Sequence, residues 1–214
     1  TKNKGKEVKM KITSIEPQKN NNDRVNIYLD GNFAFGISIE ILYKYGLEKD
    51  TEIDEEYIKN VLKAEERSKA INYALNFLNF KWRTEKEIRN KMLLKGYDEK
   101  IIQEAISYLK EQKLIDDRRF AEGFVKDKIN FNKLGKYRLK NELYNKGISG
   151  DIIDEVLSEN CDDELERAME LGRKKLPSYK NDDKNAIYRK LGGFLQRKGY
   201  SYDCISKVMR ELLK

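Results

Sequence analysis

The stretch LLKGYDEKIIQEAISYL, residues 93–109, decides the fold because its pattern returns twice further along the chain. A lysine and a glycine followed by an apolar residue recur at Gly96, Gly147 and Gly199, which stand 51 and then 52 residues apart. Glycine readily adopts the left-handed backbone that ends a helix. Two residues after each glycine stands Asp or Ser, residue types that cap the next helix. The pattern predicts the same corner between two helices three times.

Apolar residues flank all three glycines at helical spacing. They stand eight and four residues before each glycine and five, six, nine and ten residues after it, and a further apolar run precedes them. Residues at these spacings share one helix face, so each repeat is predicted to hold three helices around a small core. The predicted core residues are Ala70, Ala74, Phe77, Leu78, Ile88, Met92, Ile101, Ile102, Ala105 and Ile106; Phe120, Ala121, Phe124, Val125, Leu139, Leu143, Ile152, Ile153, Val156 and Leu157; and Leu165, Ala168, Leu171, Leu191, Leu195, Cys204, Ile205, Val208 and Met209.

We therefore expect a mainly α protein, a tandem array of three three-helix repeats, elongated and curved. A small N-terminal element that contains a β-hairpin precedes the array. The expected bounds are residues 1–63 for this element and 64–115, 116–160 and 161–214 for the three repeats. Gly192 and Gly193 are expected to interrupt the middle helix of the third repeat, because each glycine costs a helix about 1 kcal/mol relative to alanine.

The N-terminal element reads as strands followed by short helices. Apolar and polar residues alternate in VKMKITSIE (8–16) and RVNIYL (24–29), and Asp30-Gly31-Asn32 separates the second run from FAFGI (33–37). This is the signature of a strand, a turn and a strand. Ser38 and Asp54 are of the types that cap helices, so we expect a helix after each of them.

Catalytic and metal sites find little support. The chain has no histidine, which excludes Ser-His and Cys-His nucleophiles, and its two cysteines, Cys161 and Cys204, form no CxxC pair. Acidic pairs at 116–117, 162–163 and 182–183 could hold magnesium in a nuclease. Each pair precedes an apolar run, so helix capping explains them better. We expect no enzyme, no metal and no cofactor, a packed thiol at Cys204, and no assignable role for Cys161.

The charge balance points to a polyanionic or acidic partner. The net charge is +7, and residues 117–150 alone carry nine basic residues against four acidic ones. Such a surplus favours nucleic acid or an acidic protein groove. No apolar run approaches the roughly 18 residues of a membrane span, so we expect a cytoplasmic monomer with no membrane contact.

Aromatic and basic residues lie side by side at two equivalent turns, in Phe80-Lys81-Trp82-Arg83 and in residues 131–138. Cations beside rings can contact phosphates and stack bases, although Trp82 can equally be a core residue. The recurrence predicts one basic ridge. Its expected contact residues are Lys81, Arg83, Arg89, Arg118, Arg119, Lys126, Lys133, Lys136, Arg138 and Lys140.

From residue 83 to 128 the sequence resembles the RecX family, regulators of the bacterial RecA recombinase. The motifs that carry the resemblance are EKEIRNKMLLKGY, IIQEAISYLKEQKLIDD and DDRRFAEGFVKD, and it continues through GKYRLKNELYNKGI. The resemblance covers residues 70–158 strongly and the third repeat more loosely. It implies a non-catalytic regulator that lies in the groove of the RecA filament on single-stranded DNA and lowers the ATPase, strand-exchange and coprotease activities of RecA. The alternative is a direct binder of single- or double-stranded DNA that competes for DNA.

Overall fold

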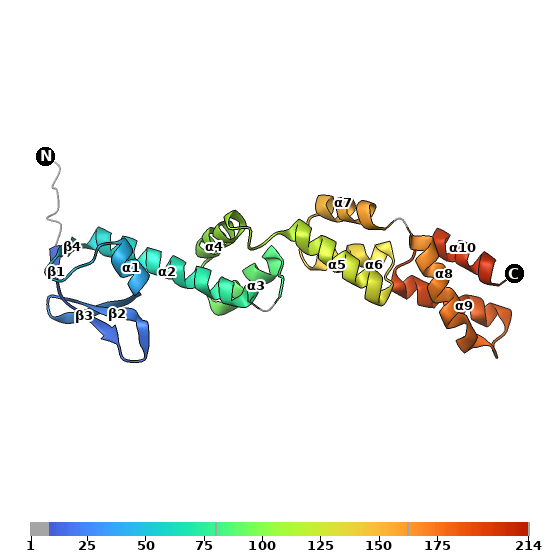
Figure 1. The fold of residues 1–214 in the computed structure, drawn as a ribbon, viewed down its shortest axis with the longest axis horizontal. Coiled ribbons are helices and arrows are strands. Elements are labelled where there is room, and N and C mark those ends of the chain that lie inside the picture. The colour runs from blue at the N-terminus through green and yellow to red at the C-terminus, as the bar shows by residue number, and fades with distance from the viewer. Residues whose placement is uncertain (1–8, 80, 162, 214) are drawn as a thin grey trace. The chain divides into compact units, whose positions relative to one another are not determined.

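The computed structural model describes residues 9–79, 81–161 and 163–213, and the chain divides into two compact units (Figure 1). The N-terminal unit comprises the residues up to Phe77 together with Met92–Tyr108, and the C-terminal unit comprises Leu78–Lys91 and Leu109–Lys214. The first repeat therefore contributes residues to both units. Among the described residues, no helix has the length and apolar character that a membrane crossing requires.

The N-terminal unit begins with a four-stranded antiparallel sheet in the order β3-β2-β1-β4. Its strands are β1 (Lys9–Gln18), β2 (Asn21–Leu29), β3 (Asn32–Ser38) and β4 (Glu52–Asp54). The expected hairpin is confirmed as β2 and β3, which are joined through Asp30 and Gly31 with φ of 49° and 83°. Positive φ at both central residues matches the right-handed twist of the strands. The short strand β4 was not predicted.

One helix follows β3 and another follows β4, and both begin at the expected caps. Helix α1 (Ile39–Lys44) starts after Ser38, whose hydroxyl accepts a hydrogen bond from the Ile41 N–H at 3.3 Å. Helix α2 (Glu55–Leu78) starts after Asp54, which accepts from the Tyr57 N–H at 2.7 Å. The sequence placed the end of the N-terminal element at residue 63, whereas α2 passes this residue without a break.

A buried carboxylate ties α2 to the sheet. Glu65 is 3% exposed and accepts hydrogen bonds from the Arg24 guanidinium at 2.7 Å and from the Ser38 N–H at 2.9 Å. Burial alone would raise the pKa of Glu65, but the Ser38 N–H and the Arg24 charge outweigh it and hold this pKa below its ordinary value. The ionised form is thus the form that the fold requires.

Each repeat contains three helices, as the sequence predicted. They are the end of α2 with α3 (Glu85–Lys95) and α4 (Glu99–Glu111); α5 (Asp117–Asn132), α6 (Lys136–Asn145) and α7 (Gly150–Asn160); and α8 (Glu164–Lys175), α9 (Lys184–Lys198) and α10 (Tyr202–Leu212). A short 3-10 helix, η1 (Leu176–Tyr179), was not predicted.

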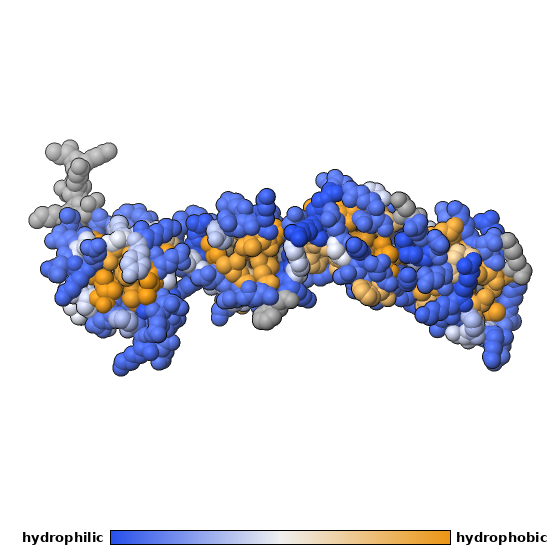
Figure 2. Space-filling model, in the orientation of Figure 1, coloured by the Kyte–Doolittle hydropathy of each residue, from blue (hydrophilic) through white to orange (hydrophobic). Residues whose placement is uncertain are grey.

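The expected apolar faces form the cores of the repeats. The six residues that precede the corners, Ile88, Met92, Leu139, Leu143, Leu191 and Leu195, have no exposed surface. Leu165 differs, since it is 42% exposed. Six other predicted core residues are only half-buried, namely Phe77, Leu78, Phe120, Phe124, Ile152 and Leu171. Figure 2 shows apolar residues gathered in separate patches within a mainly hydrophilic surface. Several small cores, rather than one large one, stabilise the chain.

The three glycine corners have the same backbone geometry. Gly96, Gly147 and Gly199 have φ of 91°, 88° and 94°. In each corner the residue after the glycine donates its N–H to the carbonyl five residues earlier, at 3.3, 3.2 and 3.2 Å. This is the hydrogen bond of a left-handed helix C-cap, so the predicted corner is confirmed in all three repeats.

The pair Gly192-Gly193 does not interrupt the third repeat, and that prediction is wrong. Helix α9 continues through both residues. A Cβ atom added to Gly192 would lie 3.3 Å from the Met209 Cε. The glycine allows α9 to approach α10 closely, and this packing offsets the weak helix propensity.

Candidate functional site

The expected contact residues all lie in the C-terminal unit. They stand on α3, α5 and α6, on the turn before α3, and, in the case of Lys133, directly after α5. The structure brings these residues into one unit, but neighbouring carboxylates pair with several of them. The set therefore divides into cations that the chain itself uses and cations that stay open to a partner.

Arg118 is the most strongly engaged of these cations. Its guanidinium donates to Glu122 at 3.0 Å, to Glu159 at 2.9 Å and to Glu155. Three carboxylates around one guanidinium give this point of the surface a net negative charge. Arg118 therefore joins α5 to α7 and adds little to the attraction of a polyanion.

Four further members of the expected set also form ion pairs within the chain. The pairs are Arg89 with Glu85 at 3.3 Å, Lys133 with Glu170 at 3.3 Å, Arg138 with Glu142 at 2.9 Å, and Lys140 with Asp154 at 2.6 Å. Exposed pairs of this kind contribute about 1 kcal/mol or less each. Together with Arg118, five of the ten expected contact residues thus pair with carboxylates of the chain.

Three lysines of the set stay open. Lys81, Lys126 and Lys136 are exposed, and their ammonium groups have no hydrogen-bond or ion-pair partner among the residues that the structure describes. The backbone N–H of Lys136 alone is engaged, because it donates to Glu164 at 2.8 Å. Arg83 is half-buried at the turn before α3.

Trp82 and Arg119 form an aromatic and cationic pair on the same unit. The Arg119 guanidinium lies 4.5 Å from the Trp82 ring centroid, and Trp82 is 50% exposed. Trp82 is thus a surface residue, which settles the two interpretations that the sequence left open. Phe80, which the sequence grouped with it, lies outside the described residues.

A cavity of about 450 Å³ lies beside this pair, between Trp82 and the face of α5 that carries Gly123. A Cβ atom added to Gly123 would meet no described atom within 4 Å, so this side of α5 is open. Arg119, Gly123 and Lys126 are spaced by four and three residues and therefore share one helix face. We call Lys81, Trp82, Arg119 and Lys126 the aromatic-cationic face.

The corner at Gly147 joins the second repeat to the start of α3. The Thr84 hydroxyl donates to the Lys146 carbonyl at 2.7 Å, and the Lys86 ammonium donates to the Asn145 carbonyl at 3.2 Å. In return, the Lys146 ammonium donates to Glu87 at 2.8 Å. The last carbonyls of a helix have no partner within that helix. Here α6 places them against donors at the positive end of α3.

The corner at Gly199 repeats this arrangement at the start of α6. The Gly135 N–H donates to the Lys198 carbonyl at 2.9 Å, and the Tyr137 N–H donates to the Gly199 carbonyl at 3.1 Å. The Arg138 guanidinium donates to the Arg197 carbonyl at 2.9 Å. Each of these corners is thus a joint in which the end of one helix caps the beginning of another.

The sequence pattern predicts the corners but not the joints. Thr84 and Gly135, which receive the two corners, stand 51 residues apart and so occupy the same position of the repeat. Their shared position, together with the lysine that recurs in every corner, was the available signal. This signal is weak in the sequence because threonine and glycine are unlike residue types.

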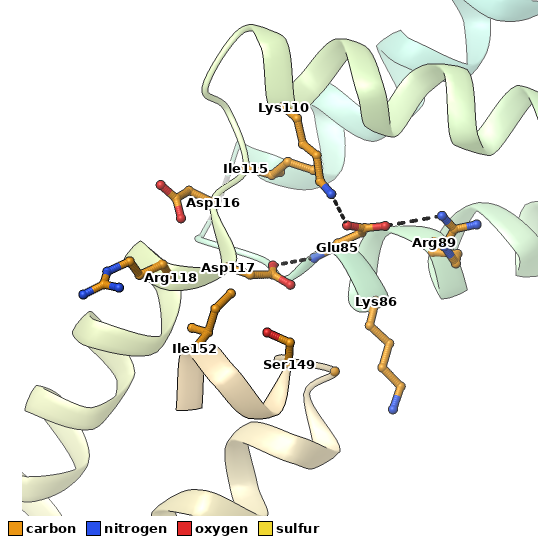
Figure 3. A pocket seen from close by; sticks show the side chains of 11 residues that line it. Glu85, Lys86, Arg89, Lys110, Ile115, Asp116, Asp117, Arg118, Ser149 and Ile152 are labelled. Atoms are coloured by element: carbon orange, nitrogen blue, oxygen red, sulfur yellow. Dashed lines mark hydrogen bonds and ion pairs between the residues drawn. The ribbon is translucent and has the colours of Figure 1, made fainter. Parts of the chain in front are cut away.

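A second cavity, of about 680 Å³, lies between α3, α5 and α7 (Figure 3). The Glu85 carboxylate accepts from Lys110 at 2.5 Å and from Arg89 at 3.3 Å. The backbone N–H of Glu85 donates to the Asp117 carboxylate at 2.9 Å. Burial alone would raise the pKa of Glu85, but the two cations outweigh it and hold this pKa below its ordinary value. Burial raises the pKa of Asp117. The charges on this wall already pair with one another, so they stabilise the joint.

Helix capping is confirmed for two residues of the acidic pairs, whereas Asp163 forms no side-chain capping hydrogen bond and Asp182 pairs with Lys190 at 2.6 Å. Asp116 accepts from the Arg119 N–H at 3.0 Å, and Asp183 accepts from the Ala186 N–H at 2.8 Å. Asp162 lies outside the described residues. Within the described ranges, no group of three or more His, Cys, Asp or Glu side chains is placed to hold a metal ion.

Both cysteines are buried and form no disulfide. Cys204 is 8% exposed in the core of the third repeat, and burial raises the pKa of its thiol to about 11. The prediction of a packed core thiol is confirmed for Cys204. Cys161 belongs to the core of the second repeat.

Comparison with known proteins identifies related families over nearly the whole chain. Residues 10–54 match the regulatory protein RecX N-terminal domain. Residues 70–109, 116–157 and 162–209 match the first, second and third three-helix domains of RecX.

Several curated relatives and solved structures are similar along most of their length. Regulatory protein RecX of Clostridioides difficile (strain 630) is 43% identical over 203 residues, which cover 94% of this chain and 95% of the relative. The Clostridium perfringens (strain 13 / Type A) protein of the same name is 42% identical over 205 residues, covering 94% and 96%. A crystal structure of regulatory protein RecX aligns with a TM-score of 0.78 at 32% identity, covering 93% of this chain and 98% of that one. RecX from Lactobacillus salivarius aligns with a TM-score of 0.65 at 33% identity, covering 70% and 97%.

Proposed function

Because the chain belongs to the RecX family, we propose that it regulates the RecA recombinase by binding the RecA filament on single-stranded DNA. Bound there, it lowers the ATPase, strand-exchange and coprotease activities of the filament. The observation that carries the site is the aromatic-cationic face, where Arg119 covers one side of a half-exposed Trp82 and two lysines stay open.

The chemistry of this face suits a partner with both acidic and flat or apolar groups. Lys81 and Lys126 can form ion pairs without giving up an internal partner. Arg118, by contrast, would have to exchange internal carboxylates for external ones, so a new contact would gain little. We therefore expect Lys81, Trp82, Arg119 and Lys126 to carry most of the binding free energy of the expected contact set.

The test is the ATPase of RecA on single-stranded DNA, together with filament length and strand exchange, as the protein is added up to saturation. We expect Lys126→Glu and Trp82→Ala to weaken inhibition. Lys207→Glu is the matched control, because it reverses the charge of another exposed helical lysine. The Lys207 ammonium forms no hydrogen bond or ion pair with the described residues. If the wild-type protein leaves all three activities unchanged at saturation, the proposal is wrong.

Direct binding of single-stranded DNA is a second candidate function, and the Trp82–Arg119 pair favours it. A ring with an adjacent guanidinium can stack nucleobases, a contact worth about 1 to 3 kcal/mol per base. Binding to phosphates would weaken by about one logarithmic unit per tenfold rise in salt for each phosphate neutralised. Binding to a naked single strand that is absent, or that salt does not affect, would reject this candidate.

A further inference from the structure

The described residues contain three copies of one docking element, and other described residues occupy two of them. At Gly147 an added Cβ atom would strike the Lys86 side chain, and at Gly199 it would strike the backbone of Arg138. At Gly96 the added atom would meet no described atom within 4 Å. The corner of the N-terminal unit therefore has the backbone of a joint without the partner of a joint.

The side chains of the open corner confirm the contrast. Lys146 and Lys198 are half-buried, and their ammonium groups donate to Glu87 and to the Asn132 carbonyl. Lys95, at the equivalent position, is exposed and has no partner within the described part of the chain.

An apolar side chain marks the same place. Leu94, directly before Lys95, is 87% exposed, and Leu93 is 47% exposed. The residues that take the place of Leu94 in the occupied joints are Asn145 and Arg197, which are polar and lie at the edge of their joints. A contact made at the open corner can thus bury apolar surface that the internal joints do not offer.

The occupied joints define what such a corner binds. In both of them the corner carbonyls receive donors from the first turn of a helix, namely from the Thr84 hydroxyl in one and from the Gly135 and Tyr137 N–H groups in the other. In the first joint Glu87, three residues after Thr84, accepts from the lysine of the corner. The complementary surface is therefore a helix N-terminus with an acceptor for the corner lysine, which is the Glu87 carboxylate in the first joint and the Asn132 carbonyl in the second. A carboxylate in the first turn is the acceptor that best matches an exposed lysine.

The equivalent helices of a second copy of this chain do not offer such a surface. The starts of α3 and α6 are already covered by the corners at Gly147 and Gly199. In the third repeat Ile187 takes the position of Gly135, but α9 begins earlier, at Lys184, and Asp183 caps it. The start of α9 therefore differs from the two helix starts that receive corners, and none of the three equivalent helices of a second copy offers the surface that the joints use. We therefore look for the occupant on a different protein.

We propose that the corner Leu94–Tyr97 docks the N-terminal turn of an α-helix of a partner protein, with an acidic residue of that turn facing Lys95. The identity of the partner rests on the proposed function, and we take it to be the filament protein itself. The corner is then a second contact, separate from the aromatic-cationic face.

Photo-cross-linking tests the proposal on the full chain. A benzophenone amino acid replaces Leu94, the protein is bound to RecA filaments, and the cross-linked residues are mapped by mass spectrometry. We expect cross-links within or directly before the first turn of a RecA helix. Cross-links to another kind of segment, to DNA or to a second copy of this chain would overturn the proposal, as would intact binding without any cross-link.

Binding measurements with substituted proteins separate this proposal from the proposed function. We expect Leu94→Asp to weaken filament binding about tenfold or more, because it removes apolar surface that the contact buries. We expect Lys95→Glu to weaken binding too, because it replaces attraction to an acidic residue with repulsion. Tyr202→Asp is the control, because Tyr202 is 79% exposed in the third repeat. If the wild-type protein fails to bind the filament, both proposals fail. If it binds and the two variants bind equally well, only the corner proposal fails.

Discussion

Replacing Gly135 by alanine tests the joint between the second and third repeats. Gly135 has φ of −84° and ψ of 163°, an extended conformation that alanine adopts without strain. The added Cβ atom would lie 2.5 Å from the carbonyl carbon and oxygen of Gly199 and 2.6 Å from the Tyr200 nitrogen. Because these are backbone atoms, no side-chain rotation can relieve the overlap, and the corner must move away from α6.

The magnitude follows from two opposing effects. Overpacking costs about 1 to 3 kcal/mol, while alanine restricts the unfolded chain and returns about 0.4 to 1 kcal/mol. We expect Gly135→Ala to lower the free energy of unfolding by about 1 to 2 kcal/mol in urea denaturation followed by circular dichroism.

Gly123→Ala is the matched control for this substitution. Gly123 lies inside α5 with no described atom near its added Cβ, so alanine should stabilise the protein by about 0.5 to 1 kcal/mol. Hydrogen exchange should accelerate in the third repeat of Gly135→Ala, because neighbouring repeats stabilise one another. If Gly135→Ala is as stable as the wild-type protein, the joint described above does not contribute to stability.

Three further predictions concern stability and reactivity. Gly96→Ala should lower the free energy of unfolding by about 1 to 2 kcal/mol, because alanine disfavours the left-handed backbone. Gly199→Ala should lower it further in the same urea assay, because the added Cβ atom also displaces the Arg138 backbone. Equal losses in the two variants would contradict the joint. Glu65 and Glu85 have lowered pKa values in the fold, so the stability that they contribute should be complete above the ordinary pKa of 4.5 and lost as the pH falls through the folded pKa values. Urea denaturation between pH 7 and pH 3 measures this loss. A free energy of unfolding that stays constant down to pH 3 would contradict it. In a Cys161→Ser background, a thiol reagent at pH 8 should modify native Cys204 far more slowly than the unfolded protein, and equal rates would show that the thiol is not packed.

The helices and corners could be predicted from the sequence because both depend on residues close together in the chain. Apolar spacing fixed the buried faces, and Gly96 and its two copies fixed the corners. The joints could not be predicted in the same way, since Thr84 and Lys146 stand 62 residues apart and meet only when the repeats pack. Strand β4 has three residues and depends on pairing with β1, so no local pattern announces it.

The candidate contact surface stays a prediction, and the sequence does not show which of its cations form ion pairs within the chain. A count of charges along residues 117–150 treats every cation as available. Arg118 shows why this fails, because its partners Glu155 and Glu159 lie on α7, outside the counted segment. Sequence charge therefore overestimates the attraction of this surface for a polyanion. Lys126 differs from Arg118 because it forms no ion pair with any described residue, although Glu122 and Asp127 are close in the sequence, and only the packed structure reveals this.

The direction of the repeats gives the chain two unlike ends. Each joint places the negative end of one helix on the positive end of an earlier one, so α9 is followed by α6 and α6 by α3. At α9 the series ends in a helix that Asp183 caps and that is longer than its counterparts, and no corner of the described residues docks there. At Gly96 it ends in carbonyls and an exposed Leu94 that nothing in the described chain covers. The two ends of the series therefore differ, and the open corner at Gly96 is the end that offers a docking surface to a partner.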